Sequence, residues 1–458
     1  MADKLNKTTV KVLMVSLGCD KNRVDSEMML GTLLRAGFAL TENEEEADAV
    51  VVNTCCFIED AKKESIETLL NMAALKETAG VKVLIAAGCL AVRYKDEILK
   101  EIPEVDAVVG VTAEDKIAEV LMEAFDGIRS VRFRDISDDP KWKSDRVLST
   151  GTVTSYLKIA EGCDKNCTYC VIPKVRGHYR SVPMDSLIAE AARLADQGVK
   201  ELIVVAQETT RYGQDLYGEK RLHLLLKELC RIDGLHWIRV LYAYPEEIYP
   251  ELIEVMASEP KICHYLDLPI QHSSDRILKK MNRRTDRASL IELVSRLRAA
   301  MPDIVLRTTL LTGFPSETEE DVDDLMDFIG SVRFDHLGVF AYSREEGTPA
   351  ARMKDQVPAR EKKKRRKRLM EAQQMISEAC GQNRIGRVME TMIEGFLPEE
   401  GVYIGRTYGD TPDVDGYVFI ESDRDLMSGD FVNVRITGAS EYDLQGKIFE
   451  EEWDEPAK

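Results

Sequence analysis

The sequence lacks any apolar run of the ~18 residues that a membrane-spanning helix needs. Its polar start, MADKLNKTTV, has no signal-peptide apolar stretch, so we expect a cytoplasmic protein. Positive charge is also scarce, because 62 Lys and Arg residues stand against 81 Asp and Glu residues, a formal net charge of −19. This deficit argues against broad nucleic-acid binding, which needs basic surface to neutralise phosphates. The other account of the negative charge is that it only keeps the protein soluble.

The chain has 458 residues, which is enough for about two to four domains. Apolar content of 44% and charged content of 31% are typical of a soluble globular protein. The ten cysteines are many for a reducing compartment, where disulfides are rare. Cysteines that cluster are therefore better explained by metal ligation or redox chemistry.

Residues 1–128 alternate short apolar runs with helical patterns, which predicts a doubly wound α/β domain. The Val-rich runs 10–17, 49–53 and 81–87 are typical of buried parallel strands. Each run ends just before a cysteine: Cys19, Cys55 with its neighbour Cys56, and Cys89. The loops after parallel strands gather at one edge of a sheet, so these thiols are expected to converge.

Two further segments follow an aperiodic stretch, 129–150, which we interpret as a linker. The central one, 149–380, repeats strand and helix patterns and predicts a partial or complete TIM-type barrel. Its six expected strands are 153–160, 201–207, 237–244, 265–271, 304–311 and 337–342. The last segment, 381–450, has glycine-punctuated alternating runs that predict a small β-barrel of the oligonucleotide-binding kind.

The pentapeptide GCDKN occurs twice, and its second copy opens the pattern Cys163-x₃-Cys167-x₂-Cys170. Three thiolates on the loop after the first barrel strand suit an iron–sulfur cluster, and no fourth cysteine lies nearby. One iron would then be open to a substrate or cofactor. The alternatives are a zinc knuckle, which prefers a fourth protein ligand, or three unconnected thiols.

This pattern at the start of a βα barrel resembles the radical S-adenosylmethionine superfamily. The resemblance implies a [4Fe–4S] cluster whose open iron is chelated by the amino and carboxylate groups of the cofactor. It also implies that one electron from the cluster cleaves the cofactor to a radical. The chain would supply orientation and shelter from solvent.

The flanking motifs resemble one branch of that superfamily, the methylthiotransferases. SLGCDKNRVDSE, NTCCFIEDAKKES and AAGCLAVRY resemble their N-terminal domain, whose cysteines hold a second cluster. The resemblance implies Cys19, Cys55 and Cys89 as its ligands, with Cys56 a buried thiol. EGCDKNCTYCVIPKVRG and LTGFPSETEED resemble the radical domain, and residues after 381 resemble the substrate-binding TRAM domain.

Within that family, the stretches QETTRYG and VDSE resemble the type that modifies an aspartate of small-subunit ribosomal protein twelve. The resemblance implies methylthiolation of the aspartate β-carbon, with S-adenosylmethionine as methyl donor and radical source. It also implies an electron donor and a sulfur source. The alternative is the type that acts on a tRNA adenosine.

Charge favours the protein substrate. Residues 383–447 contain six basic and thirteen acidic residues, a net charge of −7. We expect the carboxylates of Asp410, Asp413 and Asp415 in this segment to lie at the surface. An acidic barrel attracts a basic ribosomal protein and repels a phosphate backbone.

The resemblance alone suggests the residues that contact S-adenosylmethionine. Tyr169 inside the cluster loop would touch the adenine, and Arg307 would pair with the cofactor carboxylate, a role that suits a guanidinium fork. The remaining predicted contacts are Glu208 and Thr209 at the amino group, and Gly313 and Phe314 at the adenine pocket.

Overall fold

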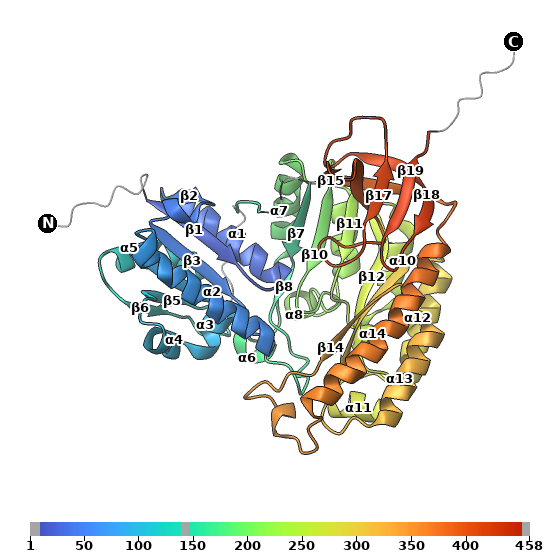
Figure 1. The fold of residues 1–458 in the computed structure, drawn as a ribbon, viewed down its shortest axis with the longest axis horizontal. Coiled ribbons are helices and arrows are strands. Elements are labelled where there is room, and N and C mark those ends of the chain that lie inside the picture. The colour runs from blue at the N-terminus through green and yellow to red at the C-terminus, as the bar shows by residue number, and fades with distance from the viewer. Residues whose placement is uncertain (1–9, 139–145, 150, 152, 451–458) are drawn as a thin grey trace, which may run out of the picture. The chain divides into compact units, whose positions relative to one another are not determined.

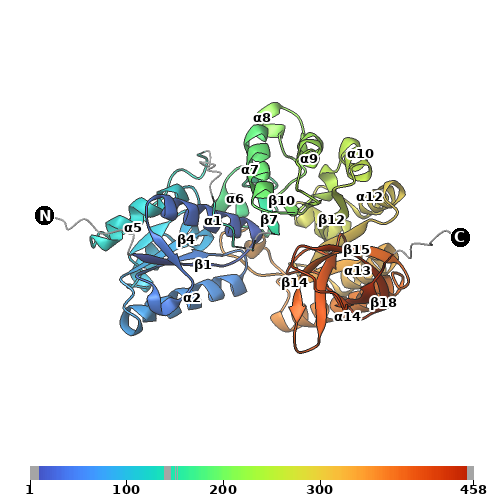
Figure 2. The same cartoon turned by 90° about the horizontal axis from the view of Figure 1, so that it is seen from above.

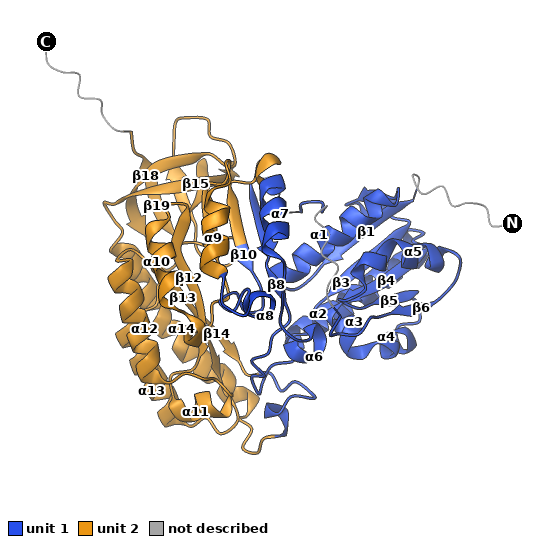
Figure 3. Cartoon of the chain, turned by 180° about the vertical axis from the view of Figure 1, so that it is seen from behind, with its two compact units in different colours: residues 1–194, 204–221, 343–352 blue, residues 195–203, 222–342, 353–458 orange. Residues whose placement is uncertain are grey.

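A computed structural model describes residues 10–138, 146–149, 151 and 153–450 (Figure 1). The chain forms two compact units (Figure 3). Unit 1 consists of residues 1–194, 204–221 and 343–352, and unit 2 of residues 195–203, 222–342 and 353–458. Within the described ranges, no helix is both long enough and apolar enough to cross a membrane.

The first sheet lies in unit 1 and has the parallel order β2-β1-β3-β4-β5-β6. Its central strands β3 and β4 are buried along their whole length, which explains their near-continuous apolar sequences AVVVNT and VLIAAG. The strands are β1 (Lys11–Ser16), β2 (Ala39–Thr41), β3 (Ala49–Thr54), β4 (Val83–Gly88), β5 (Ala107–Val109) and β6 (Ser130–Arg132).

Helices cover both faces of this sheet, and Figure 2 shows α1 and α2 on opposite sides of β1. One core packs Met29 and Leu33 of α1 against the sheet, together with residues of α5. The other core packs Leu69 and Met72 of α2, with residues of α3 and α4. The helices are α1 (Asp20–Arg35), α2 (Glu59–Thr78), α3 (Cys89–Tyr94), α4 (Asp96–Glu101) and α5 (Ile117–Phe125), with short 3₁₀ turns η2 (Glu44–Glu46) and η3 (Glu114–Lys116). The predicted doubly wound domain is confirmed.

The second sheet has the order β14-β13-β12-β11-β10-β7, so its six strands lie side by side in the order in which they occur in the sequence. This is the partial TIM-type barrel expected from the sequence. Its strands are β7 (Thr154–Lys158), β10 (Glu201–Val205), β11 (Trp237–Val240), β12 (Ile262–Gln271), β13 (Val305–Thr312) and β14 (His336–Ala341). A two-stranded ribbon, β8 (Ala160–Glu161) and β9 (Arg180–Ser181), flanks the cluster loop in unit 1.

The helices of this central region follow its strands. Thr318 and Asp321 form a capping box at the start of α13, which accounts for the SETEED motif. The helices are α6 (Ile172–Arg176), α7 (Met184–Asp196), α8 (Gln214–Tyr217), α9 (Leu222–Cys230), α10 (Pro250–Ser258), α11 (Asp275–Lys280), α12 (Arg287–Ala300), α13 (Glu319–Val332) and α14 (Ala359–Gln382), with 3₁₀ turns η4 (Pro245–Glu247) and η5 (Ala350–Arg352).

The third element is a closed barrel in unit 2 with the order β15-β16-β17-β19-β18. Its five strands lie within the segment whose glycine-punctuated alternating runs predicted a small β-barrel. Alternating side chains fill the interior, which contains Met389, Ile393, Val418, Ile420, Val434, Ile436 and Leu444. The strands are β15 (Val388–Leu397), β16 (Val402–Thr407), β17 (Val418–Glu421), β18 (Phe431–Ala439) and β19 (Leu444–Ile448).

The interpretation of 129–150 as an aperiodic linker was partly wrong, because Ser130–Arg132 forms the edge strand β6. Three residues are too few to show a period, so pairing with β5 rather than local pattern creates this strand. Residues 139–145 and 150 of that stretch lie outside the described residues.

Candidate iron–sulfur centre

Three cysteines follow neighbouring strands of the first sheet. Cys19 precedes α1 directly after the turn that ends β1, Cys55 follows β3, and Cys89 opens α3 after β4. In the order β2-β1-β3-β4 the chain reverses direction of winding between β1 and β3. The carboxyl ends of strands at such a switch point form the usual ligand crevice of an open α/β sheet. The sheet therefore brings these thiols to a ligand-binding edge.

The two copies of GCDKN begin with a glycine in the same unusual backbone conformation. Gly18 has φ of 90° and Gly162 has φ of 80°, a region that L side chains rarely adopt. A Cβ on Gly18 would lie 2.8 Å from Cβ of Cys55, and one on Gly162 would lie 2.0 Å from the carbonyl oxygen of His178. The two copies differ afterwards, because α1 begins at Asp20 whereas the second copy continues as a loop. Both copies therefore present a cysteine directly after a glycine that a side chain could not replace without strain.

The environments of Cys55 and Cys56 differ. Sγ of Cys55 would lie 3.0 Å from a Cβ on Gly18, so this thiol faces the turn that presents Cys19. Cys56 is fully buried in the apolar core between the sheet and α2. Burial raises the pKa of the Cys56 thiol to about 11. A protonated thiol in an apolar core is a small hydrophobic side chain.

Asn22 of α1 fastens the ends of these strands together. Its Nδ2 donates to the carbonyl oxygens of Leu17 (3.0 Å) and Thr54 (3.1 Å). Its Oδ1 lies 3.8 Å from Sγ of Cys89. The side chain thereby links all three cysteine-bearing loops of the first sheet.

The second triad lies on the loop after β8, also in unit 1. The Cys163 N–H donates to the carbonyl oxygen of Gly177 (3.1 Å), and the Cys170 N–H donates to that of Cys167 (3.0 Å). The N–H of Ile172 lies 3.4 Å from Sγ of Cys170, at the start of α6. Cys163 and Cys167 are buried, and Cys170 is half-buried. The loop is thus held by its own backbone at both ends.

The thiols of both triads are free of disulfides. Burial raises the pKa of the Cys163 thiol to about 12 and that of Cys89 well above its usual value. Such sites disfavour a bare thiolate and favour one bound to a cation. In the described parts of the chain, no three His, Cys, Asp or Glu side chains are grouped to hold one metal ion. A cubane engages each cysteine through a different iron, so its ligands stand farther apart than those of one ion. Both triads fit a cluster in ligand type and number.

A buried charged network joins the two loops, and sequence reasoning missed it. Arg176 at the end of α6 contacts Cys89, Asn22, Asp25 and Glu161. Lys158 of β7 pairs with Asp25 and lies 2.9 Å from Glu161. Charged residues are rarely buried unless they are paired, so a sequence alone gives little reason to expect such a network. The available signal was that Asp25 and Arg176 stand inside the motifs VDSE and PKVRG.

Three predicted cofactor contacts lie in unit 1. Glu208 and Thr209 follow β10 and are fully buried, whereas Tyr169 is half-buried in the cysteine loop. The Glu208 carboxylate accepts a hydrogen bond from Oγ1 of Thr210 (3.0 Å) and lies 3.7 Å from Nζ of Lys165. These residues therefore form a polar patch next to the second triad in the same unit.

The other predicted contacts lie in unit 2. Gly313 and Phe314 follow β13, and the ring of Phe314 packs edge-on against Tyr342 with centroids 5.5 Å apart. Arg307 lies within β13 and already has two partners, Asp267 at 3.2 Å and Asp415 at 3.3 Å. The two acids raise the pKa of the Arg307 guanidinium despite its burial.

The expectation that Asp410 and Asp415 are surface carboxylates was wrong. Asp410 accepts from Thr407 and pairs with His336, and Asp415 accepts from the Tyr265 hydroxyl (2.7 Å). Their sequence neighbourhood is polar and glycine-rich, which gives no sign of burial. Nine carboxylates of the barrel segment are exposed nevertheless, against four exposed basic residues: Glu390, Glu399, Glu400, Asp413, Glu421, Asp423, Asp425, Glu441 and Glu450 against Arg387, Arg424, Arg435 and Lys447.

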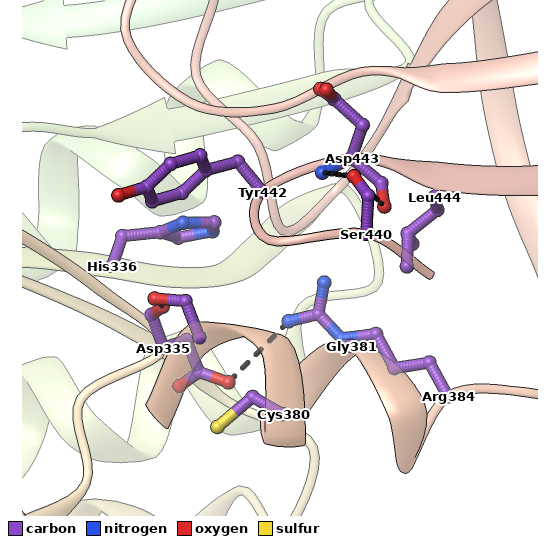
Figure 4. Close-up of a pocket in the computed structure, with 10 residues that line it drawn as sticks. Asp335, His336, Cys380, Gly381, Arg384, Ser440, Tyr442, Asp443 and Leu444 are labelled. Atoms are coloured by element: carbon purple, nitrogen blue, oxygen red, sulfur yellow. Dashed lines mark hydrogen bonds and ion pairs between the residues drawn. The ribbon is translucent and has the colours of Figure 1, made fainter. Parts of the chain in front are cut away.

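A small recess in unit 2 lies where β14 and α14 meet the loop before β19 (Figure 4). Arg384 and Asp335 form an ion pair across it at 3.4 Å. His336 and Tyr442 line it as well. None of the predicted site residues lies there.

Comparison with known proteins agrees with this architecture. Three family models match in order: "Uncharacterized protein family UPF0004" at residues 11–110, the radical SAM superfamily at 157–329 and the TRAM domain at 385–449. A protein of Lachnoclostridium phytofermentans described as "Ribosomal protein uS12 methylthiotransferase RimO" is 57% identical over 437 residues, 95% of this chain and 99% of the relative. The chain belongs to the RimO family. RimO proteins of Clostridioides difficile and Acetivibrio thermocellus are 49% and 50% identical, each over 96% of this chain and 99% of the relative.

Solved structures support the fold of this RimO family member. The radical S-adenosylmethionine methyltransferase TsrM from Kitasatospora setae, with cobalamin and a [4Fe–4S] cluster bound, aligns with a TM-score of 0.54 at 15% identity. The alignment covers 75% of this chain and 74% of TsrM. A second TsrM structure, with tryptophan and a cofactor analogue, gives a TM-score of 0.53 at 15% identity, with 72% of each chain covered.

Proposed function

We propose that this protein transfers a methylthio group to the β-carbon of an aspartate in ribosomal protein uS12, with S-adenosylmethionine as methyl donor and radical source. The observation that carries the proposal is the pair of cysteine triads on strand-end loops of one compact unit. Membership of the RimO family, whose relatives are described as acting on uS12, supports this substrate.

Each triad has a separate role in this proposal. Cys163, Cys167 and Cys170 hold a cluster that supplies the electron for cofactor cleavage, and Cys19, Cys55 and Cys89 hold one that carries the sulfur to be transferred. Cys55 is the ligand rather than Cys56, because only Cys55 faces the Gly18 turn. The chain keeps both sites shielded, since five of the six ligands are buried or half-buried.

The residues around the triads orient the cofactor. Glu208 and Thr209 are buried polar groups beside the cysteine loop, which suits them to bind an amino group, and Tyr169 offers a ring in the same loop. Gly313 and Phe314 remain the candidates for the adenine pocket. Arg307 remains the candidate for the cofactor carboxylate, and Asp267 and Asp415 hold its guanidinium in place. The pair with Asp415 also holds β13 against the loop after β16.

The acidic barrel is the surface that we assign to the ribosomal protein. The β15–β16 turn carries Glu399 and Glu400, and the loop after β17 carries Asp423 and Asp425. The Leu426 N–H donates to the Tyr403 hydroxyl (3.2 Å), which fastens the loop after β17 to the first residues of β16, next to the β15–β16 turn. Phe396 is 49% exposed and Met427 is 72% exposed there, so apolar contact area accompanies the charge. A basic protein with an apolar loop fits such a surface.

The test uses the purified, anaerobically reconstituted protein with reductant, a sulfide source and S-adenosylmethionine. It is offered uS12, small ribosomal subunits or tRNA, and each product is analysed by mass spectrometry. A methylthio mass increase on an aspartate of uS12 is the expected result. Modification of a tRNA adenosine instead would overturn the proposed substrate, and cofactor cleavage with neither product would overturn the transfer. The reaction is placed in the cytoplasm, where ribosomal proteins and cellular reductants meet.

A further inference from the structure

Arg176 connects the loops of the two cysteine triads within unit 1. It is the last residue of α6, the helix that begins two residues after Cys170, and it precedes Gly177, whose carbonyl oxygen accepts the Cys163 N–H (3.1 Å). Its backbone therefore belongs to the loop of one triad. Its side chain, 2% exposed, extends to the other triad.

The guanidinium contacts a proposed cluster ligand directly. Nε donates to Sγ of Cys89 at 3.1 Å, and a terminal nitrogen bonds to Oδ1 of Asn22. Asn22 in turn holds the carbonyl oxygens at the ends of β1 and β3. One side chain thus fixes Cys89 together with the turn that presents Cys19.

Two carboxylates hold the other end of the guanidinium. Nη1 of Arg176 lies 2.6 Å from Asp25 and 3.2 Å from Glu161, the residue before the Gly162 turn. Lys158 pairs with the same two carboxylates. Two cations thus balance two carboxylates, and each of the four side chains is at most 6% exposed. A guanidinium fork can satisfy several acceptors at once in fixed directions, which a lysine cannot do.

The guanidinium of Arg176 keeps its positive charge. A guanidinium stays protonated in proteins, and Asp25 and Glu161 pair with this one directly. A permanent cation at 3.1 Å from a sulfur ligand stabilises negative charge on that sulfur.

We infer that Arg176 is a positioning residue that couples the two cluster loops and, through its Nε–H···Sγ bond to Cys89, raises the reduction potential of the cluster held by Cys19, Cys55 and Cys89. The inference rests on the proposed function, because it requires a cluster on Cys19, Cys55 and Cys89. Hydrogen bonds to the sulfur ligands and nearby charge set the potential of an iron–sulfur cluster. The hydrogen bond and the positive charge of Arg176 both stabilise the reduced cluster, which carries the greater negative charge. Removing them should therefore shift the reduction potential to more negative values.

The experiment isolates the cluster on Cys19, Cys55 and Cys89. Full-length protein carrying C163A, C167A and C170A is reconstituted, and its remaining cluster is titrated by potentiometry followed by electron paramagnetic resonance. In this background, R176K should shift the midpoint potential to more negative values, and R176Q should shift it further. K158Q is the matched control, because it also removes one cation from Asp25 and Glu161. We expect a smaller shift from K158Q than from R176Q.

Three results would overturn the inference. Iron-loaded R176K and R176Q could keep the parental potential and spectrum, or K158Q could shift the potential as much as R176Q does. The third is a loss of iron from R176K that is matched by K158Q with an equal fall in melting temperature, since Arg176 would then only hold the fold. A parent protein with no cluster on Cys19, Cys55 and Cys89 contradicts the proposed function itself, and iron analysis of the parent separates that failure from the others.

Discussion

Arg406 of β16 lies 2.6 Å from Glu201 of β10, and both side chains are completely buried. Arg239 of β11 lies 2.9 Å from the same carboxylate. Burial alone would raise the pKa of Glu201, but Arg406 and Arg239 outweigh it and hold the pKa at about 2. The carboxylate therefore remains ionised, and it fastens the C-terminal barrel to two strands of the second sheet within unit 2.

The first prediction is that Glu201→Gln destabilises the protein strongly. Removing the anion leaves the buried Arg239 without a carboxylate partner and leaves Arg406 with Glu394 alone, which costs about 3–5 kcal/mol. Urea denaturation followed by circular dichroism measures the loss. The matched control is Glu421→Gln, which removes an exposed carboxylate from its pair with Lys447 on the same barrel and should leave the midpoint nearly unchanged.

The same pair predicts a pH dependence. The pKa of Glu201 is lowered from an ordinary 4.5 to about 2, so its stabilising contribution is complete above pH 4.5 and is lost as the pH falls toward 2. The parent should therefore lose stability over this range, and Glu201→Gln should lose less of it. An equal acid dependence in both proteins would contradict this account.

The sequence predicted the elements that local pattern determines. The buried runs of β3 and β4 and the alternation of β18 each showed their period, and each predicted strand of the second sheet is present. The short edge strand β6 had too few residues to show a period and depends on its pairing with β5. Spacing also pointed to Cys163, Cys167 and Cys170 as candidate ligands, because all three lie on one loop. The burial of charged side chains was the main feature that the sequence did not predict. Arg176, Glu201 and Asp415 have sequence neighbourhoods like those of ordinary surface residues, and only tertiary packing places their charge partners beside them.

The second prediction is that the reconstituted protein binds about eight irons per chain, four for each [4Fe–4S] cluster. Changing Cys163, Cys167 and Cys170 together to Ala should leave about half of the iron. Colorimetric iron and sulfide analysis measures both values. About four irons in the unaltered protein, or zinc in their place, would contradict the assignment of two clusters.

The third prediction separates the roles of the two triads. Cys55→Ala should abolish the methylthio product while cofactor cleavage to 5′-deoxyadenosine continues, because the radical cluster is held by another loop. Cys56→Ala is the matched control at the adjacent position. It removes a core thiol rather than a ligand, so it should keep product formation with a modest loss of stability. Both products are quantified by liquid chromatography and mass spectrometry. The assignment fails if Cys56→Ala abolishes transfer and Cys55→Ala does not.

The fourth prediction concerns the acidic end of the barrel. Reversing Glu399, Glu400, Asp423 and Asp425 to Lys should lower kcat/KM for uS12 about tenfold at low salt, because electrostatic attraction acts mainly on the rate of encounter. The defect should shrink at saturating uS12 and at higher salt, since charges are screened over ~10 Å at 0.1 M. Uncoupled cofactor cleavage should be unchanged. A control variant carries the same change of charge at four exposed carboxylates of unit 1, Glu45, Glu64, Glu67 and Glu77. If both variants slow equally, net charge alone is responsible and the barrel is not the docking surface. Gain of activity on tRNA by the barrel variant would instead show that its acidic surface excludes nucleic acid.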